Sequence, residues 1–258
     1  MVLYCTCFVL EIGEIPRVSR PTGEAATAQA SDGLRPVRFR RLAPPRLASN
    51  LLFAMTAYNS WDREAAVRRA LAHADSSSSS EADGGMIWNF AFGSNISAAK
   101  VKSRGMIPSA SLRGRLPGWT LLFNHNGGYG NIETVEKIQA AKYDLSCLPQ
   151  PVPEETHGVL LRLSRRDFAE LARQEYAYDT VEVAVEVYDE DCSAAGVGGD
   201  GETKRIQHAL AFKTSACALT TARTMPTARY ISIIREGAKK AGISAQYCRW
   251  LEAIRPNY

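Results

Sequence analysis

Glu175 is a carboxylate at the end of the apolar face of a predicted helix. The helix is expected over residues 164–175, where Phe168, Leu171 and Ala172 recur at helical spacing and Glu175 takes the next step of that stripe. A carboxylate there is costly unless a partner or a cavity receives it. Burial would raise its pKa toward the range in which a carboxyl group transfers protons at neutral pH. The alternative is that the helix end frays and Glu175 turns toward solvent.

A strand–turn–helix junction forms a second candidate site. Phe92-Gly93-Ser94-Asn95 follows a predicted strand, residues 86–92, and precedes a short helical stretch, residues 98–104. Backbone N–H groups at such a junction favour an anion, including a substrate carboxylate. Ordinary tight turns show the same pattern, so the junction alone leaves both interpretations open.

Two other stretches are rich in glycine. Residues 126–131, beside His125, either allow the backbone to approach a ligand closely or give a flexible loop. Residues 196–201 match the GxGxxG pattern by letter, but a dinucleotide site requires a strand before the pattern and a helix after it. Here the stretch joins two predicted strands, so we expect a hairpin loop.

The elements that must position these residues predict an α+β domain. Ser164 can cap the helix that leads to Glu175, and Asp167 three residues later fits a capping box. Strand 181–188 alternates valines with Glu182 and Glu186, and strand 206–213 should pair with it as a hairpin. Further strands are expected at 86–92, 116–123 and 157–163, and helices at 60–74, 228–240 (closed by Gly242) and 245–254.

The composition is that of an ordinary globular chain and excludes several classes of function. Of 258 residues, 45% are hydrophobic and 22% are charged, with a net charge of +4, which is enough apolar material for a core. No basic block is interleaved with aromatic residues and no apolar run is long enough for a bilayer, so we expect no nucleic-acid partner and no membrane span. The cysteines and histidines lack paired spacing, which predicts no metal site, no disulfide framework and a cytoplasmic protein with reduced thiols. They are Cys5, Cys7, Cys147, Cys192, Cys217, Cys248, His73, His125, His157 and His208.

The chain changes character near residue 85. Residues 1–85 are expected to form a disordered leader and linker with one short helix, including a serine run at 76–80. Arginines cluster between residues 35 and 46, as in plastid or mitochondrial transit peptides, although Glu11, Glu14 and Asp32 depart from that pattern. Both an organelle-targeting segment and an untargeted leader are left open. The folded domain is predicted at 86–258.

Four segments together resemble the γ-glutamylcyclotransferase family. The resemblance covers residues 86–256, and the segments occur in the family's order. The family's F-A-Y-G-S-N opening resembles Phe90-Ala91-Phe92-Gly93-Ser94-Asn95, and its glycine-containing strand start resembles Tyr129-Gly130-Asn131-Ile132-Glu133. The Q-E step that carries the family's catalytic glutamate resembles Gln174-Glu175. The family's P-S-x-x-Y…G-A…Y terminus resembles Pro226-Thr227-Ala228-Arg229-Tyr230 with Glu236-Gly237-Ala238 and Gln246-Tyr247.

The resemblance implies a fold, a reaction and a set of site residues. The fold would be a small mixed β-barrel flanked by helices. The reaction would be cyclisation of a γ-glutamyl amino acid or amine to 5-oxoproline, as in glutathione metabolism, with Glu175 as general acid/base and with no cofactor and no metal. Self-association as a homodimer is left open. The implied substrate-binding residues are Phe92, Gly93, Ser94, Asn95, Gly130, Asn131 and Tyr230.

Three residues depart from the family pattern. Phe92 replaces the usual tyrosine, Tyr176 stands where glycine is usual, and Phe212 stands where related sequences often carry tyrosine. These changes bear on substrate identity and on whether activity is retained. The alternatives are therefore a non-catalytic ligand-binding or interaction module on the same fold, and a γ-glutamyl hydrolase or acyltransferase.

Overall fold

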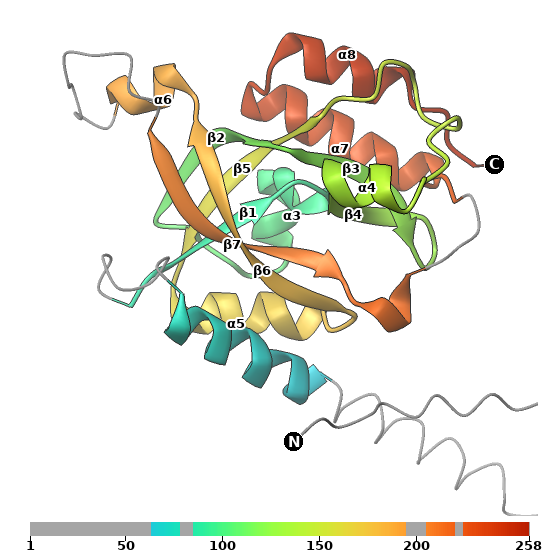
Figure 1. Cartoon of the computed structure of the whole chain (residues 1–258). Helices are drawn as coiled ribbons and strands as arrows, with labels where there is room; N and C mark the ends of the chain where they lie inside the picture. Colours follow the sequence, from blue (N-terminus) through green and yellow to red (C-terminus); the bar gives the residue numbers. More distant parts are fainter. Residues whose placement is uncertain (1–62, 78–84, 195–204, 220–223, 258) are drawn as a thin grey trace, which may run out of the picture. The chain divides into compact units, whose positions relative to one another are not determined.

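Five strands close into a barrel in the computed structural model, which describes residues 63–77, 85–194, 205–219 and 224–257 (Figure 1). All of these residues belong to the unit Arg46–Tyr258. Around the barrel the order is β1 (Ile87–Ala91), β5 (Glu155–Leu163), β2 (Ala110–Pro117), β6 (Tyr178–Val187) and β7 (Ile206–Thr214). Neighbouring strands are antiparallel except β1 and β7, whose parallel pairing closes the barrel. The predicted fold class, α+β with a small mixed β-barrel and flanking helices, is confirmed.

A separate two-stranded sheet, β3 (Trp119–His125) with β4 (Tyr129–Thr134), lies at one end of the barrel. The predicted strand 116–123 is wrong, because it combines the end of β2 with the start of β3. Gly118 separates the two strands with a φ of 75°, a left-handed conformation that glycine adopts without a steric penalty. The hydrophobic pattern continues across this turn and so hides it.

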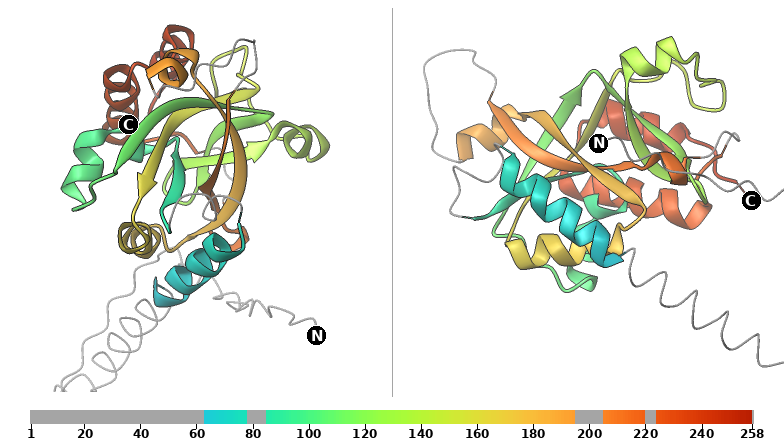
Figure 2. Two further views of the ribbon diagram at one scale, coloured as in Figure 1. Left: turned by 90° about the vertical axis from the view of Figure 1, so that its left-hand side faces the viewer. Right: turned by 60° about the horizontal axis from the view of Figure 1, so that its bottom comes forward.

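Helices cover the outside of the barrel (Figure 2). They are η1 (Ser94–Ile96), α3 (Ala98–Ser103), α4 (Val135–Ala140), α5 (Arg165–Gln174), α6 (Asp189–Ala194), η2 (Ala216–Ala218), α7 (Ala228–Ala241) and α8 (Ala245–Ala253), with a further helix over residues 63–76. An acidic run at 189–191 begins α6, because acidic side chains favour a helix N-terminus. Among the described helices, none has the length and apolar character needed to cross a membrane.

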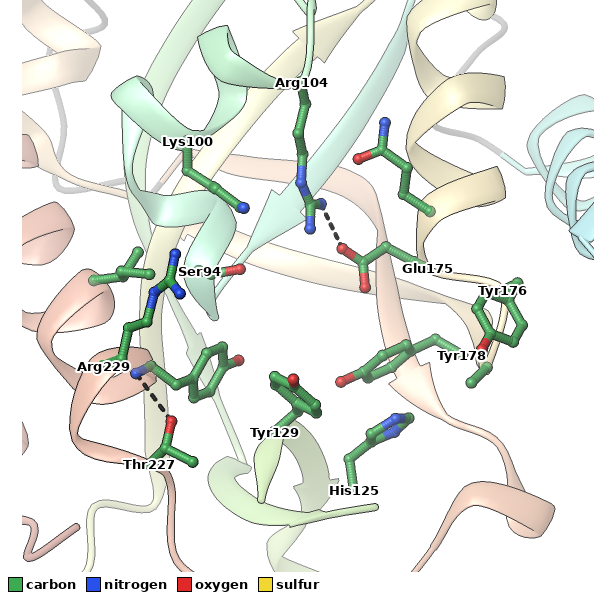
Figure 3. Close-up of a pocket in the computed structure, with 14 residues that line it drawn as sticks. Ser94, Lys100, Arg104, His125, Tyr129, Glu175, Tyr176, Tyr178, Thr227 and Arg229 are labelled. Atoms are coloured by element: carbon green, nitrogen blue, oxygen red, sulfur yellow. Dashed lines mark hydrogen bonds and ion pairs between the residues drawn. The ribbon is translucent and has the colours of Figure 1, made fainter. Parts of the chain in front are cut away.

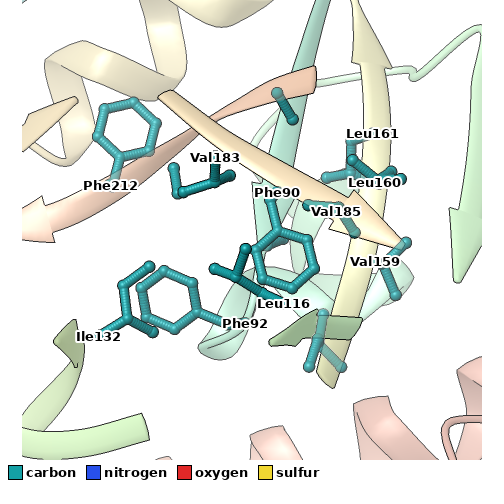
Figure 4. Packing of buried hydrophobic residues seen from close by; sticks show 14 of the residues in the cluster. Phe90, Phe92, Leu116, Ile132, Val159, Leu160, Leu161, Val183, Val185 and Phe212 are labelled. Carbon is teal, nitrogen blue, oxygen red and sulfur yellow. The ribbon is translucent and has the colours of Figure 1, made fainter. Parts of the chain in front are cut away.

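The barrel interior is apolar because the strands alternate as predicted. Val183, Val185 and Val187 of β6 are buried, whereas Glu182 is exposed on the other face. β1 is buried throughout and places Phe90 in the centre, among side chains from β2, β5 and β6 (Figure 4). The predicted hairpin between β6 and β7 is confirmed.

Helix α5 carries the apolar stripe that the sequence predicts. Ser164 caps the helix, with its hydroxyl accepting a hydrogen bond from the Asp167 N–H at 3.1 Å. Phe168 and Leu171 are fully buried. The helix ends at Gln174, and Glu175 is its C-terminal cap. The carboxylate is therefore delivered to the rim of the barrel, immediately before β6.

The helix over residues 63–76 packs beside α5. Val67, Ala70 and Ala74 are buried, and Glu64 forms an ion pair with Arg173 of α5 at 2.9 Å. The helix predicted at 60–74 is thus present in its described part. The predicted domain boundary at residue 86 stays a prediction, and residues 1–62, most of the serine run and the stretch 196–201 lie outside the described residues.

Gly158→Ala should weaken the barrel. Gly158 lies in β5, where an added Cβ atom would be 2.4 Å from the Ala91 carbonyl oxygen and 2.8 Å from the Phe90 ring. Overpacking of this kind lowers the free energy of unfolding by about 1–3 kcal/mol, which urea unfolding would measure. Ala184→Ser, at an exposed position of β6, is the control and should change it by less than about 0.5 kcal/mol. Equal stabilities would contradict the close packing at Gly158.

Candidate active site

A pocket of about 470 Å³ opens where α5 ends and α7 begins (Figure 3). This volume is in the range of small-molecule sites. The pocket lies beside η1 and α3 on one side and the start of β6 on the other. It is lined by Ser94, Lys100, Arg104, His125, Tyr129, Gln174, Glu175, Tyr176, Ala177, Tyr178, Thr227, Arg229, Tyr230 and Ile233.

Glu175 forms an ion pair with Arg104 in this pocket. Arg104 Nη1 lies 2.6 Å from Glu175 Oε1, and both side chains are largely buried, with exposed fractions of 18% and 16%. Asn95 Nδ2 also donates to the same oxygen at 3.2 Å, and the side-chain oxygen Oδ1 of Asn95 accepts from Arg104 Nη1 at 2.9 Å. The three side chains thus form one hydrogen-bonded triangle. The sequence left open a partner, a cavity or a frayed end for Glu175, and the structure provides both a partner and a cavity.

The second carboxylate oxygen of Glu175 is available to a ligand. Both hydrogen bonds to the carboxylate end on Oε1, and within the described part of the chain nothing donates to Oε2. Figure 3 shows this oxygen directed toward the middle of the pocket. One oxygen is therefore fixed, while the other can accept or deliver a proton.

A narrow recess extends the pocket toward the barrel. It measures about 40 Å³, and Gly93, Ser94, Gly130 and Tyr230 are among its walls. The Gly130 N–H donates to the Tyr230 hydroxyl at 3.0 Å. A Cβ atom at either Gly93 or Gly130 would lie only 3.0 Å from that hydroxyl, so the two glycines leave room for the tyrosine.

The Tyr230 hydroxyl keeps its own proton at neutral pH. Burial raises the pKa of Tyr230 to about 12, and the negative charge of Glu175 acts in the same direction. The hydroxyl oxygen accepts from the backbone N–H groups of Gly130 and Ser94, yet the hydroxyl donates to no group among the described residues. Its O–H is therefore a free donor facing the recess.

Aromatic side chains form the opposite wall. His125 and Tyr178 stack with ring centres 4.3 Å apart, and the Tyr178 hydroxyl donates to the Gly130 carbonyl oxygen at 3.0 Å. Tyr129, half-exposed at the mouth, meets Tyr230 edge to face. Burial raises the pKa of Tyr178 and lowers that of His125. Both side chains are consequently uncharged at neutral pH.

Most predicted site residues meet at this pocket. Glu175, Ser94 and Tyr230 line it, and Phe92, Gly93, Asn95 and Gly130 line the recess. Asn131 does not reach either cavity. It is fully buried, donates to Asn124 and accepts from the Thr214 N–H, and so it attaches β4 to the end of β7.

Sequence reasoning missed Arg104, Lys100, Arg229 and Tyr178. Arg104 ends the predicted stretch 98–104, nine residues after Asn95, but nothing in its local pattern indicates a partner 71 residues away. Tyr178 follows Glu175 by three residues, and its position before the predicted strand 181–188 concealed its role. Across the described residues, no group of three or more His, Cys, Asp or Glu side chains could hold a metal ion.

Two of the three family departures do not obstruct Glu175. Tyr176 is 39% exposed, and the Arg63 guanidinium lies 5.1 Å from its ring centre, which holds the ring at the edge of the pocket. Phe212 packs against Phe168 of α5 with ring centres 5.8 Å apart. Phe92, the third, places a buried ring in the recess where the family pattern has a hydroxyl.

Comparisons with known proteins find similar solved structures only. The chain matches no protein-family model and no curated protein sequence. It is similar to a structure described as a γ-glutamyl cyclotransferase, with 20% identity, a TM-score of 0.48 and coverage of 67% of this chain and 89% of the other. It is also similar to the structure of an uncharacterised protein from Homo sapiens, with 20% identity, a TM-score of 0.49 and coverage of 67% of this chain and 90% of the other. A third similar structure is described as a γ-glutamyl cyclotransferase specific to glutathione from yeast, with 16% identity, a TM-score of 0.45 and coverage of 66% of this chain and 96% of the other.

The stability of the protein should fall on acidification, in part through His125. Because burial lowers the pKa of His125 in the folded state, the unfolded chain takes up the proton first. The contribution of His125 to the free energy of unfolding is complete above its pKa in the unfolded chain, about 6.5, and is lost as the pH falls from there toward its pKa in the folded protein. His125→Gln should therefore show a smaller loss of unfolding free energy between about pH 7 and about pH 5 in urea titrations. An unchanged pH dependence in this variant would contradict the prediction.

Proposed function

We propose that this protein is a γ-glutamylcyclotransferase, which converts a γ-glutamyl amino acid or amine to 5-oxoproline and releases the free amino acid or amine. The observation that carries the proposal is the state of Glu175. Its Oε1 is fixed by Arg104 and Asn95, and its Oε2 faces a substrate-sized pocket. The residue with this geometry is the one that the motif resemblance designates as general acid/base.

The reaction requires little beyond folding the substrate and moving protons. The substrate's α-nitrogen attacks its own γ-carbonyl carbon, a new C–N bond closes the five-membered ring, and the C–N bond to the leaving group then breaks. The nucleophile is tethered, which supplies much of the catalytic advantage once the pocket holds the reactive conformer. Arg104 and Asn95 keep Glu175 at a fixed position for that conformer.

Glu175 would carry the protons. Its Oε2 accepts a proton from the α-ammonium group, which makes the α-nitrogen nucleophilic, and the attacking nitrogen loses a second proton as the amide forms. The leaving nitrogen gains one proton when its bond breaks and another when it is released as an ammonium ion. No water or co-reactant is consumed, and the proton count balances.

The developing negative charge on the γ-carbonyl oxygen needs a donor. The Tyr230 O–H faces the recess and has no acceptor among the described residues, so it can donate to this oxygen as the tetrahedral intermediate forms. A donor placed in advance at this position stabilises such an oxyanion. Gly93 and Gly130 contribute by leaving room for the hydroxyl. Substrate contact by Phe92 and Ser94 stays a prediction, whereas Asn131 lines neither cavity.

Glu175→Gln should lower kcat by about 100- to 10,000-fold, because the amide cannot take the proton from the α-ammonium group. Release of 5-oxoproline from a panel of γ-glutamyl amino acids and amines would measure this. Glu170→Gln is the matched control, because Glu170 lies on the same helix and pairs with Arg173 outside the pocket.

Three results would reject the cyclotransferase. Unchanged turnover in Glu175→Gln would remove Glu175 from the mechanism. Binding of γ-glutamyl compounds to the wild-type protein without release of 5-oxoproline would favour the non-catalytic module. Release of free glutamate in place of 5-oxoproline would indicate a hydrolase.

Arg104→Met should lower kcat by roughly 10- to 100-fold with a smaller change in KM, because Glu175 loses the partner that fixes its position. Steady-state kinetics would separate the two constants. Arg166→Met, at an exposed position of α5, is the control for loss of an arginine. A rise in KM at unchanged kcat would show instead that Arg104 binds substrate and does not position the glutamate.

A further inference from the structure

Two basic side chains line the pocket without a counter-charge among the residues that the structure describes. Arg104 is paired with Glu175, but Lys100 and Arg229 also line the pocket. Within the described part of the chain, neither forms an ion pair or a side-chain hydrogen bond. Figure 3 shows both on the wall opposite Tyr176 and Tyr178. The pocket therefore holds three cationic side chains and a single carboxylate.

The position of Arg229 is unusual for a basic residue. It is the second residue of α7, whose N-terminus is capped by Thr227. The helix macrodipole makes this end positive, so cations are favoured at the opposite end. A guanidinium at this exposed position gains nothing from the helix dipole, whereas an anion that binds beside it is favoured by both. Arginine also suits a carboxylate because its planar fork can form two parallel hydrogen bonds.

The two unpaired cations, Lys100 and Arg229, match a substrate that carries two carboxylates. A γ-glutamyl group carries one α-ammonium and one α-carboxylate, and Glu175 is available to the ammonium. The α-carboxylate accounts for one of the two unpaired cations. The other remains unpaired if the leaving group is a simple amine, but is neutralised if the leaving group carries a carboxylate of its own.

We propose that Lys100 and Arg229 form a subsite for two carboxylates, one of them on the leaving group, so that the substrates are γ-glutamyl amino acids or peptides and not γ-glutamyl amines. This specificity rests on the cyclotransferase function proposed above. The two residues come from separate elements, α3 and α7, which η1 brings together because α7 contacts η1 directly. The subsite exists only when both elements are docked on the barrel.

A matched pair of substrates tests the proposal. γ-Glutamylalanine and γ-glutamylethylamine differ only in the carboxylate of the leaving group. Hydrogen bonds to a charged group that loses solvent favour the alanine compound, and we expect its kcat/KM to be about 10- to 100-fold higher in the full-length protein. Equal values for the two compounds, or a preference for the ethylamine compound, would overturn the subsite.

Variants of Lys100 and Arg229 test whether these two residues cause the preference for a leaving group with a carboxylate. Lys100→Gln and Arg229→Gln should each reduce the ratio of the two kcat/KM values, and the double variant should bring it close to one. Lys102→Gln and Lys239→Gln remove exposed charges from the same two helices outside the pocket, and they should keep the wild-type ratio. A ratio that persists in the double variant would place the carboxylate elsewhere.

Measurements of ligand binding test the carboxylate subsite independently of the proposed cyclotransferase reaction. In the Glu175→Gln variant, calorimetric titration should give a lower Kd for γ-glutamylalanine than for γ-glutamylethylamine, and Lys100→Gln or Arg229→Gln added to it should remove the difference. This measurement does not need turnover. If wild-type protein forms no 5-oxoproline but the difference in Kd is present, the cyclotransferase fails and the subsite stands. If neither compound binds, or both bind equally, the subsite is rejected.

Discussion

The parallel pairing of β1 with β7 is the constraint on which the site depends. Phe90 aligns with Ala211 across this pair, and because the two strands run in the same direction they end at the same rim of the barrel. β6 starts at that rim, with Tyr178 opposite Thr214. The turn after β1 and the residue that caps α5 are thereby brought together. Closure of the barrel thus places Asn95 and Glu175 within hydrogen-bond distance of each other.

The ion pair at that rim links stability with chemistry. A largely buried carboxylate is tolerated only with a partner, because removing an unpaired charge from water is costly. Arg104 meets this need through Oε1 alone, and so the glutamate keeps one oxygen for a ligand. The same contact holds the side chain still. The cation that makes a buried glutamate acceptable is thus also the group that would orient it for proton transfer.

The departures from the family pattern have structural consequences in the core. Phe212 packs on Phe168, which connects β7 to the helix that ends at Glu175. Phe92 lies 6.4 Å from Phe90, ring centre to ring centre, and both residues line the recess. These rings add apolar contact where a hydroxyl would need a partner. They alter the polarity of the recess and leave the ion pair at Glu175 in place. The compartment stays a prediction, and self-association as a homodimer stays open.

The sequence by itself determined the features that repeat at short range. The stripe of α5, the cap at Ser164, the valine alternation of β6 and the short motifs were readable because helical and strand periods involve neighbouring residues. The turn at Gly118 was missed because apolar residues continue on both sides of it. Only the tertiary structure decided that Arg104 meets Glu175 across 71 residues and that Tyr178 meets Gly130 across 48. Such contacts follow from barrel closure, and no local pattern of residue types encodes which distant side chains that closure will bring together.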